Sequence, residues 1–147
     1  MTATRKTNGL GGIVDIKSHV KRNESLAREE LEQLRTETDP EKIYLGLQRY
    51  IRLRYLLEDD PYWNDDIAAF TRYSIKKTLE QSDDPAKLSD LGVNCAGSSS
   101  ETTKHLLLLI SLRKGLDIDL DPEKAACTAT VRELAALLSA ALLKAHR

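Results

Sequence analysis

The feature that most limits the fold of this chain is the tripeptide Asp-Pro-Glu, which occurs at 39–41 and again at 121–123. The aspartate can cap free backbone amides, the proline fits the first turn of a helix, and the glutamate complements the positive end of the helix dipole. After the first copy, apolar side chains recur every four positions from Ile43 to Tyr55, which is typical of a helix that faces a core. This helix is predicted to run to about Glu58.

Two signals of a second type predict helix starts in the second half of the chain. Ser98 and Glu101, like Thr130 and Glu133, have the spacing at which a hydroxyl and a carboxylate satisfy each other's backbone amides. An apolar run follows each pair, and Gly115 stands where the first of these helices can stop in a left-handed conformation. Together the signals predict an all-α fold.

The first half is predicted to hold a terminal arm and two more helices. Residues 1–22 combine glycines with basic residues and have no sustained apolar period, which predicts a disordered basic arm. Asn23 can cap a helix with a thin stripe of leucines. A further helix is expected from Asp65 to Gln81, and the large ring of Trp63 is expected to pack at the corner before it.

Charge and composition argue against several classes of function. The 147 residues include 22 basic and 23 acidic side chains, so the formal net charge of −1 gives no overall field that attracts nucleic acid or an anionic membrane. Cys95 and Cys127 lie far apart without metal-ligand spacing, and Cys127 is expected in the core. No apolar stretch suits a signal peptide or a membrane span, so the expected location is the cytoplasm.

The segments after residue 85 follow one another in an informative order. Asp-Leu-Gly-Val-Asn at 90–94 precedes the helix that starts near Ser98, the segment 116–122 links that helix to a short one, and Thr-Val-Arg-Glu-Leu at 130–134 begins the last helix. In this order the segments resemble acyl and peptidyl carrier proteins of the phosphopantetheine type. The resemblance covers residues 65–147.

The resemblance implies a carrier-like four-helix bundle at residues 63–147. The helices predicted before it form an N-terminal helical extension at residues 23–62, which is expected to pack on the bundle. Such a carrier tethers a thioester intermediate through a 4'-phosphopantetheine arm and presents it to partner enzymes without catalysing a reaction itself. The implied partners are biosynthetic enzymes and a phosphopantetheinyl transferase, with no nucleic acid and no membrane. The alternative is an unmodified, degenerate carrier that keeps the bundle as a protein–protein interaction module.

The residue that would carry the arm depends on the register of the resemblance. If the register is fixed on the start of the helix, the attachment site is Ser98, Ser99 or Ser100. If the register is fixed on the Asp-Leu-Gly motif at 90–92, Cys95 takes the place of the serine. If it is fixed on Leu116 and Leu120, the attachment site falls on Thr102. The three serines are the preferred candidates for binding the cofactor, and Thr102 and Cys95 are the alternatives.

Each candidate also has a purely structural interpretation. The serines can serve as a cap in a flexible turn, and Cys95 can be a small buried side chain instead of a reactive thiol. Lys104 and His105, in the first turns of the helix, could contact a phosphate or act as acid and base. One histidine without a paired carboxylate is weak support for catalysis, so no catalytic residue is assigned.

Overall fold

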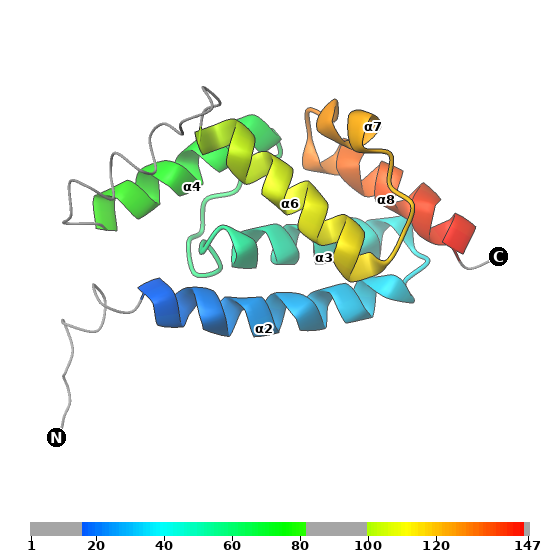
Figure 1. Ribbon diagram of the computed structural model, residues 1–147, viewed down its shortest axis with the longest axis horizontal. Helices are drawn as coiled ribbons and strands as arrows, with labels where there is room; N and C mark the ends of the chain where they lie inside the picture. Colours follow the sequence, from blue (N-terminus) through cyan, green and yellow to red (C-terminus); the bar gives the residue numbers. More distant parts are fainter. Residues whose placement is uncertain (1–15, 82–99, 146–147) are drawn as a thin grey trace, which may run out of the picture.

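The computed structural model describes residues 16–81 and 100–145, and within these ranges the chain is helical and contains no strand (Figure 1). The helices are α2 (Ile16–Arg35), α3 (Pro40–Arg54), α4 (Ile67–Gln81), α6 (Ser100–Leu116), α7 (Pro122–Ala126) and α8 (Val131–Ala145). The all-α fold class that the sequence predicts is confirmed for this part of the chain.

The strongest predicted helix starts are confirmed. Asp39 caps α3 and accepts a hydrogen bond from the Glu41 amide at 3.1 Å, and Asp121 caps α7 in the same way. At the start of α8, the Glu133 amide donates to the Thr130 hydroxyl at 3.1 Å, and the Thr130 amide donates to the Glu133 carboxylate at 3.1 Å. These starts are local interactions, which is why a short stretch of sequence predicts them.

The predicted start of the first helix is wrong, because α2 begins at Ile16 and continues through Asn23. Asn23 is not a cap. Its side chain is buried, and its amide donates hydrogen bonds of 2.9 Å to the Leu53 carbonyl and to Glu58. Residues 16–22, predicted as part of the basic arm, are therefore helical, and the other residues of that arm lie outside the described ranges.

Glu58 joins the first turns of α2 to the segment that follows α3. Its carboxylate accepts hydrogen bonds from Asn23 and Arg22, and it also pairs with the Nε2 atom of His19. Burial raises the pKa of Glu58, but the hydrogen bonds from His19 and Asn23 outweigh burial, so the pKa lies below its usual value. A carboxyl group with a lowered pKa contributes stability that is present above the unfolded-state pKa and lost as the pH falls through the folded-state pKa.

We therefore expect the first turns of α2 to lose hydrogen-exchange protection when the pH falls from about 6 to about 3.5, and Glu58→Gln to reduce this dependence. Protection factors of the amides in residues 17–26, measured at both pH values, test this. The exposed Asp59→Asn variant is the control, and it should behave like the native chain. An equal pH dependence in Glu58→Gln and in the native chain would contradict the role given to Glu58.

Helix α3 lies inside the assembly of helices. It packs against α2 and α8, whereas α6 packs against α4 and α2 (Figure 1). Buried side chains from all six described helices form one hydrophobic cluster, with Leu47 of α3, Leu112 of α6 and Leu138 of α8 among its fully buried members. The predicted segments 23–62 and 63–147 thus share a core.

The corner before α4 connects distant parts of the chain. Trp63 is partly buried and lies 4.8 Å from the ring of Phe70, centroid to centroid, so the packing predicted for it is confirmed. The Val131 amide donates to the Asp65 carbonyl at 2.8 Å, which ties the segment before α4 to the start of α8.

Two glycines allow α2 to approach its neighbours closely. A Cβ atom on Gly46 of α3 would lie 2.7 Å from a methyl carbon of Leu34, and one on Gly115 of α6 would lie 2.2 Å from a methyl carbon of Leu31. Gly115 is therefore a packing position inside α6 and not the predicted left-handed stop. That conformation falls on Asp117, with a φ of 51°.

Candidate functional site

The predicted attachment region lies around the start of α6. Ser100 is the first residue of this helix, and Thr102 is exposed in its first turn. Ser98, Ser99 and Cys95 lie outside the described residues. Ser98 was predicted to cap the helix, and the helix begins at Ser100.

The start of α6 and the end of α3 both contact α4. Glu101 accepts a hydrogen bond from Arg72 of α4 at 3.1 Å in a partly exposed ion pair. Tyr55, the C-cap residue of α3, is buried, and its hydroxyl lies 2.8 Å from the Thr71 hydroxyl. Because Thr71 donates its own proton to the Ile67 carbonyl at 2.7 Å, Tyr55 must be the donor to Thr71.

Lys104 lies beside this tyrosine. Its side chain is mostly buried, and its Nζ atom is 5.1 Å from the centroid of the Tyr55 ring. Burial, and then the nearby charge of Arg54, lower the pKa of Lys104 to about 8. The amine is still mostly protonated at neutral pH, so the site holds a poorly solvated positive charge.

His105 follows Lys104 and faces the interior. Its Nε2 atom is buried and has no hydrogen-bond partner in the described ranges. Burial lowers the pKa of His105, while Glu101 opposes this effect. Since Glu101 is engaged by Arg72, the histidine and the carboxylate form no acid–base pair, and the site offers a binding cation more than a catalytic group.

The outward face of α6 carries an apolar patch formed by Leu106, Leu107 and Ile110. These side chains are 45%, 55% and 49% exposed, respectively. The exposed Arg113 and Lys114 continue the same helical face toward the C-terminal end of α6. Sequence reasoning missed this patch, because the run from 106 to 110 is apolar on every side and its period does not separate buried from exposed positions.

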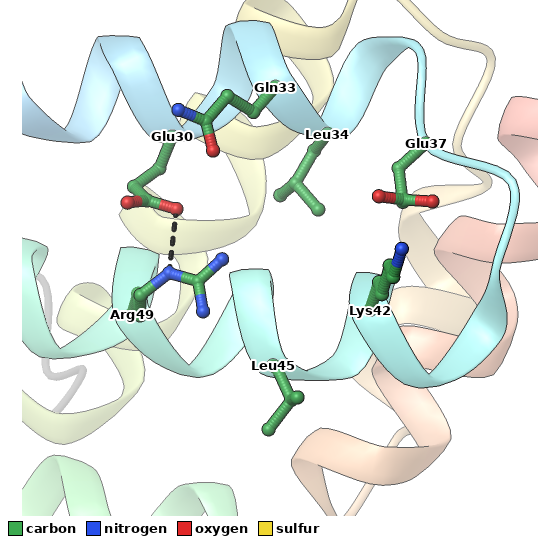
Figure 2. A pocket seen from close by; sticks show the side chains of 7 residues that line it. All are labelled: Glu30, Gln33, Leu34, Glu37, Lys42, Leu45 and Arg49. Carbon is green, nitrogen blue, oxygen red and sulfur yellow. Dashed lines mark hydrogen bonds and ion pairs between the residues drawn. The ribbon is translucent and has the colours of Figure 1, made fainter.

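The hollow between α2 and α3 is small and holds mixed charges (Figure 2). It has a volume of about 130 Å³, and Leu34 lies at its wall. Arg49 donates to Glu30 across it at 3.0 Å, while Glu37 and Lys42 lie at its other end (Figure 2). Because the charged groups of both signs face one another, the hollow offers no set of side chains that converges on one kind of ligand.

A second groove, of about 500 Å³, lies between residues 119–124 and the C-terminal half of α8. Its floor includes Leu137 and Ala141, and Lys124 and Lys144 stand among its polar lining residues. The groove is built from the end of α8, and none of its lining residues belongs to the start of α6.

Other features limit the chemistry of the described ranges. They contain no group of three or more side chains able to hold a metal ion, and no helix in them is long and apolar enough to cross a membrane.

Cys127 is exposed, so the expectation that it lies in the core is wrong. It follows the short helix α7 as its C-cap, where its side chain can turn to solvent.

Comparison with known proteins gives no relative of this chain. No protein family, no curated protein and no solved structure matches it.

Proposed function

We propose that this protein is an acyl or peptidyl carrier, or a carrier-like accessory protein, which tethers a thioester intermediate on a 4'-phosphopantetheine arm. The arm would sit on Ser98, Ser99 or Ser100, and the bundle of α4, α6, α7 and α8 would present it to biosynthetic enzymes. The observation that carries the proposal is the start of α6 at Ser100, with the mostly buried cation of Lys104 one turn later.

The start of α6 suits this role on electrostatic grounds. The first amides of a helix and its dipole favour a negative group, and a phosphodiester on a serine at this end would be such a group. The partners that the proposal requires are a phosphopantetheinyl transferase and the enzymes of a biosynthetic pathway, in the cytoplasm.

Intact mass measurement tests the proposal. After incubation with a promiscuous phosphopantetheinyl transferase and coenzyme A, the native chain should gain the mass of one phosphopantetheine group. One of the variants Ser98→Ala, Ser99→Ala and Ser100→Ala should lose this gain and so locate the arm. Ser25→Ala, in an exposed position of α2, is the matched control and should be modified like the native chain. A native chain that gains no mass would refute the carrier function.

The second candidate function is an unmodified interaction module. It is favoured by the patch of Leu106, Leu107 and Ile110, because a contiguous exposed apolar surface often marks a protein–protein contact. The mass measurement separates the two functions, since a module of this kind carries no arm on any serine.

A further inference from the structure

We propose that the outer face of α6 is the docking surface for an acidic amphipathic helix of a partner protein. The surface consists of Leu106, Leu107 and Ile110, followed one turn later by Arg113 and Lys114. The inference rests on the second candidate function, the interaction module, for which it names the class of partner, and it needs no arm on a serine.

The orientation of α6 is fixed by contacts on its opposite, inner face. Leu108, Leu109 and Leu112 are buried there, and the Tyr50 hydroxyl lies 2.6 Å from the Ser111 hydroxyl. In Figure 1, α6 runs across the front of the assembly. The outer side chains therefore point away from the core, on a helix that cannot rotate without breaking these contacts.

The outer face is more apolar than the core of this chain requires. A helix that is apolar on every side is normally buried on every side, but Leu106, Leu107 and Ile110 are about half exposed. The two leucines precede Ile110 by four and three residues, the spacing at which side chains on a helix meet. They form one continuous surface of the kind that marks contact with a partner.

The charges that accompany this apolar surface are positive. Arg113 and Lys114 are exposed one turn beyond Ile110, and no ion pair joins either cation to another described residue. No exposed side chain in the described part of α6 is acidic, and Glu101, at the other end, already has an ion pair. A partner that places carboxylates beside the two cations would therefore complement the face.

A second copy of this chain does not complement these charges. If two α6 helices paired in opposite directions, Arg113 and Lys114 of each copy would meet the first turns of the other, where Glu101 is already paired and Lys104 is positive. If the helices paired in the same direction, each cation would face its own counterpart. Like charges that are placed together oppose association, so the partner is a different, acidic protein.

The shape of the surface fits a helix. From Leu106 to Lys114 the surface is about 12 Å long, because each residue of a helix adds about 1.5 Å. A helix that lies alongside α6 can cover this length with its own apolar stripe. An extended segment would instead need the edge of a sheet, and the described ranges contain no strand.

An anionic membrane suits the surface less well. Recognition of acidic lipid headgroups typically takes about four to eight clustered lysines and arginines, whereas Arg113 and Lys114 are the only exposed cations in the described part of α6. The formal net charge of −1 adds no attraction from the rest of the chain.

Two synthetic peptides test the class of partner on the unmodified full chain. Both have about 20 residues with leucines at helical spacing, and one has glutamates beside the leucines where the other has lysines. The glutamate peptide should bind saturably and shift the amide NMR signals of residues 103–114, and added salt should weaken its binding. The lysine peptide should bind at least about tenfold more weakly.

Matched variants assign the binding to this face. Leu107→Gln should weaken the binding of the glutamate peptide about tenfold, whereas Leu143→Gln, at a position of α8 with the same exposure of 55%, should bind like the native chain. The double variant Arg113→Glu with Lys114→Glu should prefer the lysine peptide, whereas Lys144→Glu should keep the native preference. Far-UV circular dichroism confirms that each variant is folded.

Several results would overturn the inference. Failure of both peptides to bind would refute it, and so would shifts confined to the amides of α8. Equal binding of both peptides would leave the interaction module standing and refute the acidic partner. Light scattering that shows a dimer, lost in Leu107→Gln, would assign the face to a second copy. Cosedimentation with vesicles of phosphatidylcholine and phosphatidylserine, without peptide binding, would assign it to a membrane.

These outcomes are independent of the carrier function. If the glutamate peptide binds as expected and no arm attaches, the docking surface stands and the carrier function fails. If an arm attaches and neither peptide binds, the docking surface fails and the carrier function stands.

Discussion

Leu47→Ala is expected to lower the free energy of unfolding of the whole protein by about 3 kcal/mol. Leu47 is 0% exposed in α3, the helix that packs on both α2 and α8. Removing its side chain leaves a cavity among helices from both halves of the chain. The cavity can close only if α3 moves relative to α2 or α8. Urea denaturation followed by far-UV circular dichroism measures the change.

A matched control lies on the same helix. Leu45 is 44% exposed, so Leu45→Ala should change the free energy of unfolding by less than about 0.5 kcal/mol. The fluorescence of Trp63 and the circular dichroism signal should show the same midpoint, because one core is expected to unfold in one transition. Equal losses of stability in the two leucine variants would show that α3 does not hold the two halves together.

A fragment of residues 63–147 is expected not to fold on its own. The buried face of α8, which includes Leu134 and Leu138, would lose the helix that covers it, because α3 precedes the fragment. The cut also removes Tyr44, whose hydroxyl donates to Asp65 at 2.5 Å and whose ring lies 3.8 Å from the guanidinium carbon of Arg132. The fragment should therefore show poor amide dispersion and no cooperative thermal transition.

The fragment of residues 16–147 is the control for this experiment. It keeps all six described helices and should unfold at the same temperature as the full chain to within a few degrees. Cooperative unfolding of the fragment 63–147 would show instead that the carrier-like segment is an independent domain with the bounds that the sequence predicts.

The sequence predicts where the helices start better than where they stop. A start such as that of α8 depends on Thr130 and Glu133, which are close in sequence. The helix α3 was expected to reach Glu58, but it ends at Arg54, and the left-handed conformation after it falls on Leu56, with a φ of 60°. A leucine in this conformation carries no sequence signal, because glycine or asparagine is the usual residue there, although the Leu57 amide donates to the Arg52 carbonyl at 2.7 Å across the turn.

The candidate site was predictable in position but not in environment. The sequence places Lys104 and His105 in the first turns of a helix near three serines. It does not show that Lys104 lies over the ring of Tyr55, a residue 49 positions earlier that reaches the site only through the tertiary fold. The pKa of about 8 depends on burial in that fold, so no local pattern could reveal it.

The two glycines let α2 pack closely on both α3 and α6. Leu34 and Leu31 are one turn apart on α2, and they meet α3 at Gly46 and α6 at Gly115. This stretch of α2 therefore acts as a spacer that sets the distance between the two helices. A bulkier residue in this stretch of α2 would move α3 and α6 apart. The contact between Lys104 and the Tyr55 ring would then change, although neither residue had been substituted.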